Sequence, residues 1–180
     1  IYMPQKPKEK ILKIDTIFNG NIINLQKRTI KLQSGIIIQR EIIKHPGSVA
    51  IIPLINNETI ILIEQYRSAL GKVILEIPAG TLEHDEQPVD CAKRELLEET
   101  GYQATNFREL LVNYTTPGYS DEKMYFYLAT DLIHKEQKLE RDENIRTRKI
   151  KLDEINLMIK NGEIADMKTI CGISRLISKQ

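Results

Sequence analysis

The sequence has no tryptophan, two cysteines, few aromatic residues and no excess of either charge. Lysine and arginine number 26 against 25 aspartate and glutamate residues, which gives a formal net charge of +1. This balance argues against binding to nucleic acid or to a membrane surface through bulk charge. Two cysteines cannot form a disulfide-rich secreted scaffold, and no apolar run approaches the ~20 residues of a membrane span. The sequence therefore predicts a cytoplasmic protein with neither a membrane nor a nucleic-acid partner.

The first part of the chain has the pattern of a small β-sheet. Residues 1–9 are expected to be a flexible tail. Between residues 10 and 45, three strand-like runs are separated by Asn19-Gly20-Asn21 and Gln33-Ser34-Gly35, which are typical of hairpin turns. A sheet of three strands is only marginally stable unless one face is covered. We therefore expect residues 10–45 to pack against the rest of the chain or against another subunit.

Strands and helices alternate over residues 46–180. Two strand-like runs flank Asn56-Asn57-Glu58, which predicts another hairpin. Further strands are expected at 72–77, 107–113, 123–130 and 145–152, and helical patterns cover 87–100 and 152–178, the latter interrupted by Asn161-Gly162. This order predicts one α/β domain from residue 46 to residue 180.

The segment from residue 80 to residue 102 predicts a helix with an unusual acidic face. Asp85 or Glu86 suits its N-terminal end, Pro88 suits its first turn, and Gly101 suits its C-terminal stop. An apolar stripe at i, i+3 and i+7 would face the core, formed by Val89, Ala92 and Leu96.

Glu95, Glu98 and Glu99 crowd the C-terminal end of this helix. The helix dipole disfavours negative charge there by roughly 0.5 kcal/mol per group, and like charges four residues apart add a similar cost. Arg94 lies four residues before Glu98 and can pair with it. A bound Mg²⁺ ion, which prefers oxygen ligands, would also remove the conflict. The alternative is a solvated acidic face with no ligand.

The whole segment matches the pattern Gly-x5-Glu-x7-Arg-Glu-U-x-Glu-Glu-x-Gly-U, where U is a bulky apolar residue. This pattern is the Nudix box. The resemblance is complete at Gly80, Glu86, Arg94, Glu95, Leu96, Glu98, Glu99 and Gly101, and Tyr102 fills a last position that is more often aliphatic. The resemblance implies a Nudix α/β/α sandwich with a mixed sheet, preceded here by the small N-terminal antiparallel β-sheet. It also implies hydrolysis of a nucleoside diphosphate linked to another group.

The resemblance further implies a metal site. The cofactor would be Mg²⁺, with Mn²⁺ as an alternative. The implied ligands are Glu95, Glu98, Glu99 and the backbone carbonyl of Ala79, with Glu86 either in contact with them or bound to an additional metal ion. Arg94 would orient the glutamates.

Segments outside the box resemble the ADP-ribose pyrophosphatase branch of the family. They are residues 40–50, Glu64-Gln65-Tyr66-Arg67, Glu76-Ile77-Pro78-Ala79-Gly80, Pro117 at 16 residues after Gly101, and residues 162–169. Each alone can be understood as a turn, a linker or a strand end. Their order and spacing relative to the box favour the branch. The substrate contacts that we expect are Arg28, Arg40, Tyr66, Arg67, Pro117 and Tyr119.

The expected reaction is Mg²⁺-dependent hydrolysis of ADP-ribose to AMP and ribose 5-phosphate. The resemblance places the catalytic base on an acidic loop, where Glu143 is preferred to Glu140 and Asp142, and Glu98 of the box is the alternative. Arg141 in that loop departs from the usual acidic pattern. In related enzymes the N-terminal sheet packs across a homodimer and completes the substrate pocket, so we expect an intertwined homodimer.

Two other functions stay open. The protein could hydrolyse another nucleoside diphosphate sugar, such as GDP-mannose, because base selection depends on the shape of the pocket. It could instead be a non-catalytic regulator that binds ADP-ribose, which predicts loss of a box glutamate or an added DNA-binding domain. All box glutamates are present, and no stretch of this sequence suits a helix-turn-helix. The glutamate cluster disfavours a purely structural protein.

Overall fold

The computed structural model describes residues 9–139 and 144–178, and it separates into two compact units. One unit holds the chain up to His45 together with Tyr114–Lys123, and the other holds Pro46–Asn113 and the chain from Met124 onward. The tail predicted at residues 1–9 lies outside the described residues except for Glu9, which begins the first strand.

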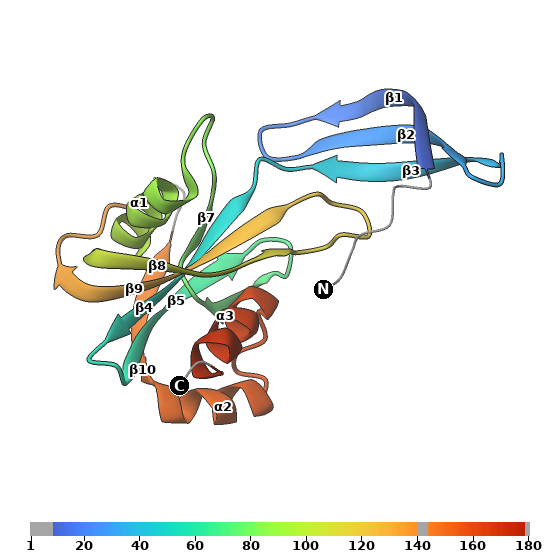
Figure 1. Ribbon diagram of the computed structural model, residues 1–180. Helices are drawn as coiled ribbons and strands as arrows, with labels where there is room; N and C mark the ends of the chain where they lie inside the picture. The colour runs from blue at the N-terminus through green and yellow to red at the C-terminus, as the bar shows by residue number, and fades with distance from the viewer. Residues whose placement is uncertain (1–8, 140–143, 179–180) are drawn as a thin grey trace. The chain divides into compact units, whose positions relative to one another are not determined.

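The N-terminal sheet has the three antiparallel strands that the turn signals predicted. They are β1 (Glu9–Asn19), β2 (Asn24–Leu32) and β3 (Ile37–Lys44), in the order β1-β2-β3 (Figure 1). Ile30 is buried where it pairs with Ile11 and Ile38. Many other large apolar side chains of this sheet and its turns are exposed: Ile11, Leu12, Ile14, Ile17, Phe18, Ile22, Ile23, Ile36 and Ile37.

The segment Tyr114–Lys123 is joined to the end of β3. The backbone nitrogen of Ile43 donates to the carbonyl of Tyr119 at 2.7 Å, and the nitrogen of Asp121 donates to the carbonyl of Ile43 at 3.2 Å. Lys44 forms an ion pair with Asp121. These contacts explain why this segment belongs to the same unit as the sheet, although Lys44 and Asp121 are 77 positions apart in the sequence.

The other unit is built on a mixed sheet, as the sequence predicted. Its strands run in the order β10-β5-β4-β9-β8, with β6 paired to β5 and β7 paired to β4. Strands β4 and β9 are parallel, whereas β4 is antiparallel to β5 and to β7. The bounds are β4 (Ser48–Ile55), β5 (Thr59–Arg67), β6 (Lys72–Glu76), β7 (Ala79–Thr81), β8 (Tyr102–Tyr114), β9 (Lys123–His134) and β10 (Ile145–Lys151).

The hairpin predicted around Asn56-Asn57-Glu58 is confirmed. Asn56 has φ 50° and Asn57 has φ 60°. Asparagine tolerates this left-handed backbone better than most residues, and two such residues in succession turn the chain tightly from β4 into β5.

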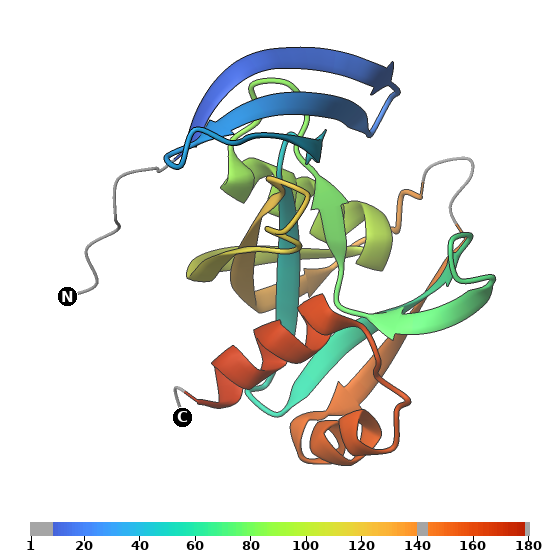
Figure 2. The ribbon, with the colours of Figure 1, turned by 90° about the vertical axis from the view of Figure 1, so that its right-hand side faces the viewer.

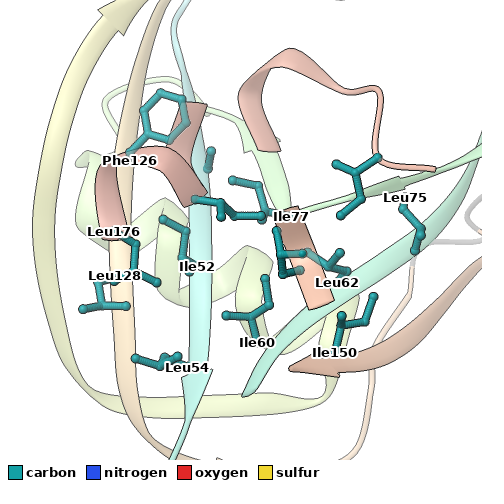
Figure 3. Close-up of a cluster of buried hydrophobic side chains, with 14 of the residues drawn as sticks. Ile52, Leu54, Ile60, Leu62, Leu75, Ile77, Phe126, Leu128, Ile150 and Leu176 are labelled. Atoms are coloured by element: carbon teal, nitrogen blue, oxygen red, sulfur yellow. The ribbon is translucent and has the colours of Figure 1, made fainter. Parts of the chain in front are cut away.

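Alternate side chains of β4 enter two different cores. Val49 and Ile51 pack with α1 (Pro88–Thr100) on one face of the sheet. The side chains of Ile52 and Leu54 point to the other face, where Figure 3 shows them among buried residues of β5, β9 and α3. This alternation has the period of two that a strand imposes. Because both faces of β4 are covered, its residues from Ser48 to Leu54 are buried.

Two helices cover the face opposite α1. They are α2 (Leu152–Lys160) and α3 (Met167–Ile177), and Figures 1 and 2 show them together on that side of the sheet. The predicted interruption at Asn161-Gly162 falls between them, and Gly162 has φ 77°, which favours glycine. No helix in the described part of the chain is long and apolar enough to span a membrane.

Candidate metal-binding active site

Helix α1 begins later than one sequence signal suggested. Asp85 and Glu86 do not cap it. The residue before the helix is Gln87, which makes no side-chain capping bond, and Pro88 occupies the first turn. The side chain of Glu86 instead turns back and accepts a hydrogen bond from the nitrogen of Glu83 at 3.0 Å. The predicted stop is confirmed, because Gly101 has φ 70° and its nitrogen donates to the carbonyl of Leu97.

The apolar face of α1 determines where its glutamates lie. Cys91, Ala92 and Leu96 are buried against the sheet, and Val89 is partly buried beside them. This packing fixes the rotation of the helix about its axis. Glu95 and Glu99 are thereby drawn against the protein interior, where they keep 9% and 2% of their surface exposed. A carboxylate at such a depth is costly unless cations or hydrogen-bond donors compensate for its charge.

The side chain of Arg94 gathers three of the box glutamates. Its Nε and Nη2 contact the two oxygens of Glu86 at 3.0 Å each, and its Nη1 contacts Glu95 at 2.7 Å and Glu98 at 3.1 Å. The hydrogen bonds from Arg94 hold the pKa of Glu86 at about 2. The sequence predicted the pair with Glu98, and the family resemblance implied that Arg94 orients the glutamates. The structure adds its two bonds to Glu86.

The segment before the helix completes the cluster. Ala79 and Gly80 belong to β7, which pairs with β4. The backbone nitrogen of Ala79 donates to Oε2 of Glu99 at 2.9 Å. A Cβ atom on Gly80 would lie 1.8 Å from Oε1 of Glu95, so a larger residue would displace the Glu95 side chain. Glycine at this position therefore lets the Glu95 carboxylate approach the backbone of β7.

The chemistry of this cluster fits a hard divalent cation. Glu95, Glu98 and Glu99 offer carboxylate oxygens within little more than one helical turn, which suits Mg²⁺ or Mn²⁺. In residues 9–139 and 144–178, no three acidic, histidine or cysteine side chains are already arranged around a metal position. In this structure the guanidinium of Arg94 contacts both Glu95 and Glu98.

The predicted substrate contacts are divided between the two units. Arg28, Arg40, Pro117 and Tyr119 lie in the unit with the N-terminal sheet, and Tyr66 and Arg67 lie on β5. Arg28 and Arg40 are directly opposite each other on β2 and β3, and Arg28 also donates to Gln26. Tyr66 and Tyr119 are exposed. The contacts of these residues with substrate stay predictions, and the predicted base residues Glu140, Asp142 and Glu143 lie outside the described residues.

Arg67 already has a partner that the sequence did not predict. Its Nε and Nη2 donate to the two oxygens of Glu76 at 2.7 and 2.6 Å. Lys168 of α3 also pairs with Glu76. Glu76 is a charged residue within an otherwise apolar run at 73–77. This position in the sequence was the signal that could have identified it as a buried carboxylate with partners.

Comparisons with known proteins agree with this fold. Residues 44–170 match the NUDIX domain family. The chain is 41% identical over 171 residues to a methanol dehydrogenase activator from Bacillus methanolicus, covering 94% of this chain and 92% of that protein. It is 36% identical over 175 residues to an ADP-ribose pyrophosphatase from Bacillus subtilis, covering 96% and 95%.

A solved structure described as an ADP compounds hydrolase has the same fold. It superposes with a TM-score of 0.85 at 19% identity, covering 98% of this chain and 96% of that one. The predicted fold class is confirmed, including the N-terminal sheet. With the glutamates of α1 and the segment before this helix gathered in one cluster, and with the family match spanning most of the sequence, the chain belongs to the Nudix family.

Proposed function

We propose that this Nudix protein hydrolyses the pyrophosphate bond of ADP-ribose to give AMP and ribose 5-phosphate. The observation that carries the hydrolytic part is the convergence of Ala79, Gly80 and the α1 glutamates on one cluster. The similarity to an ADP-ribose pyrophosphatase over nearly the whole of both chains supports the substrate.

Glu95, Glu98, Glu99 and the carbonyl of Ala79 would hold Mg²⁺ or Mn²⁺ in this proposal. When bound, a divalent cation supplies positive charge against the pyrophosphate and makes water more acidic. Before it binds, Arg94 offsets the repulsion between Glu95 and Glu98 through its contacts with both. Because Arg94 also pairs with both oxygens of Glu86, its guanidinium would stay beside the site if Glu95 and Glu98 bound the cation.

The reaction requires one base and one leaving group. Water attacks a phosphorus atom of the pyrophosphate, its proton passes to the base, and the bond from that phosphorus to the bridging oxygen breaks. The bridging oxygen leaves with the electron pair as part of the second phosphate monoester. We propose Glu143 as the base on the family resemblance. Glu98 is the alternative, because its partly exposed carboxylate lies within the cluster.

The test is a substrate panel with the purified protein and Mg²⁺. Chromatography would follow products from ADP-ribose, GDP-mannose, UDP-glucose, NADH, diadenosine polyphosphates and dGTP. We expect AMP and ribose 5-phosphate from ADP-ribose, with kcat/KM at least about tenfold above that for GDP-mannose. A higher kcat/KM for GDP-mannose than for ADP-ribose would show that the protein prefers another nucleoside diphosphate sugar. No hydrolysis of any compound would favour the non-catalytic regulator.

The similarity to a methanol dehydrogenase activator supports a second candidate function. In this proposal the chain also stimulates a methanol dehydrogenase. Methanol oxidation by such an enzyme would be measured with and without this protein, and with its Glu99→Gln variant. Stimulation by the wild type alone would tie the effect to the Nudix site, whereas no stimulation would remove this candidate.

A further inference from the structure

Residues 76–80 run from the last residue of β6 to the first residue of the box, and each of them contacts another part of the chain. The Glu76 side chain pairs with Arg67 and Lys168, and the Ile77 nitrogen donates to Oγ1 of Thr169 at 2.8 Å. The carbonyl of Pro78 accepts from Ile51, the nitrogen of Ala79 donates to Glu99, and Gly80 lies against Glu95. One end of this segment therefore contacts α3, and the other end contacts the glutamates of α1.

Glu76 has the strongest set of partners in this segment. Its carboxylate is 1% exposed, and it receives both a paired contact from Arg67 and an ion pair from Lys168. Burial would raise the pKa of Glu76, but the hydrogen bonds and charges of Arg67 and Lys168 outweigh it and lower the pKa. The carboxylate is therefore charged and held from two sides, which restricts the backbone that carries it.

The first turn of α3 supplies the remaining contacts. Asp166 caps the helix, and its Oδ2 accepts from the nitrogen of Thr169 at 2.9 Å and from Oγ1 of Thr169 at 2.6 Å. The same oxygen lies 3.0 Å from Nζ of Lys168. Thr169 is fully buried, and Lys168 keeps only 14% of its side chain exposed. The cap thus orients both residues toward residues 76 and 77, beside which the start of α3 lies (Figure 2).

We propose that Arg67, Lys168 and Thr169 are positioning residues for the metal site. They hold Glu76 and Ile77, and through them the backbone that presents Ala79 and Gly80 to Glu99 and Glu95. This inference rests on the proposed function, because it takes the glutamate cluster as a metal site. It gives the segment at residues 162–169 a physical role, and it gives Arg67 a role other than a substrate contact.

Two substitutions at one position separate positioning from stability. Thr169→Val keeps the volume of the side chain but removes the oxygen that accepts from Ile77. Thr169→Ser keeps the oxygen and removes a buried methyl group. If Thr169 only fills the core, the serine variant is the more damaging one for every property. If it positions the segment, the valine variant is the one that impairs metal binding.

The probe is Mn²⁺ alone, measured by isothermal titration calorimetry on the full chain without substrate. We expect Thr169→Val to bind Mn²⁺ about tenfold more weakly than the wild type and Thr169→Ser to stay within about twofold. The matched control is Ile155→Val on α2, a fully buried site in the same core but on a different helix from Thr169. It should lower the melting temperature without changing Mn²⁺ binding. Equal Mn²⁺ affinities for the valine variant and the wild type would overturn the proposal.

Arg67→Lys gives a second test if Thr169→Val does not fold. Lysine keeps the charge beside Glu76 but loses the paired contact. Positioning predicts weaker Mn²⁺ binding without substrate, whereas a substrate contact predicts a raised KM and unchanged Mn²⁺ affinity. The second pattern would overturn this inference for Arg67. The Mn²⁺ affinities do not depend on which nucleotide is hydrolysed, so a failure on ADP-ribose alone would not be mistaken for a failure here. A wild-type protein that binds no Mn²⁺ would refute both the metal site and its positioning.

Discussion

The backbone nitrogen of Ala79 donates to Oε2 of Glu99 across 2.9 Å, and Glu99 is almost fully buried. The carboxylate is therefore directed toward β7, and turning it to solvent would break its hydrogen bond with the half-buried Ala79, at a cost of about 1 kcal/mol. Glu99 is thus the glutamate whose orientation depends most clearly on the segment before the box.

Glu99→Gln should reduce kcat by at least about 100-fold, because an amide is a poor replacement for a carboxylate ligand of a hard cation. The amide can still accept from Ala79, so the variant should stay folded. Circular dichroism would verify the fold and AMP release would give the rate. Asp90→Asn is the matched control, since Asp90 is on the same helix but exposed and paired with Lys93. Unchanged turnover in Glu99→Gln would refute its assignment as a ligand.

Gly80→Ala should displace the Glu95 carboxylate, because the new Cβ would lie 1.8 Å from Oε1. We expect Mn²⁺ binding to weaken by about tenfold or more. Gly71→Ala is the comparison, since Gly71 has φ 64° but no atom within 4 Å of the new Cβ. That variant should lose about 1 kcal/mol of stability through its backbone and keep its Mn²⁺ affinity. Equal Mn²⁺ affinities in the two variants would contradict the account of the box glycine.

The stability that Glu76 contributes should depend on pH. Its pKa in the folded protein lies below the ordinary value of 4.5, so the contribution is complete above that value and is lost as the pH falls through the folded pKa. Glu76→Gln should be less stable than the wild type by about 3 kcal/mol at neutral pH, and the difference should shrink in acid.

Urea unfolding of wild type and Glu76→Gln across this pH range would measure the effect. Glu64→Gln makes the same substitution on β5, where Glu64 lies at a long 3.4 Å from Arg148. Its effect should stay within about 1 kcal/mol. A stability difference for Glu76→Gln that does not change with pH would show that its charge is not what Arg67 and Lys168 recognise.

The N-terminal sheet should join two copies of the chain. It exposes many large apolar side chains close together, whereas apolar residues on a protein surface are usually scattered singly. Such groups of exposed apolar residues mark interaction sites. Light scattering after gel filtration should give a mass twice the 20.8 kDa of one chain. Ile14→Lys should shift the protein toward monomer, whereas Lys13→Arg on the same strand should not. A monomeric wild type at micromolar concentration would exclude the dimer.

Glu143→Gln and Glu98→Gln distinguish the two candidate bases. If Glu143 takes the proton, its replacement should reduce kcat by about 100-fold and leave Mn²⁺ affinity unchanged. Replacing Glu98 should impair Mn²⁺ binding as well, because it is a proposed ligand. A normal kcat in the Glu143→Gln variant would show that Glu143 is not the base and would favour Glu98.

The elements were largely predictable because their signals are local. The turn at Asn56-Asn57, the stop at Gly101 and the helix break at Gly162 follow from backbone preferences of single residues. The grouping of the box glutamates on one face of α1 was predictable, because they are three and four residues apart in the sequence. The role of Arg94 as a shared partner was only partly predictable, since its bonds to Glu86 require the turn before the helix to fold back.

Contacts between distant segments could not be predicted in the same way. The hydrogen bond from Ile77 to Thr169 joins residues 92 positions apart, and the pairing of β7 with β4 involves a strand of three residues. Neither has a periodic signal. The association of Tyr114–Lys123 with β3 likewise depends on Asp121, and the residues around Asp121 have the sequence of an ordinary loop.

The most direct measurement of the central claim is product analysis of ADP-ribose incubated with the wild-type protein and Mg²⁺. The account predicts equal amounts of AMP and ribose 5-phosphate, formed by the wild type and almost absent with Glu99→Gln. Intact ADP-ribose after prolonged incubation, under conditions where the protein is folded and binds Mn²⁺, would contradict it.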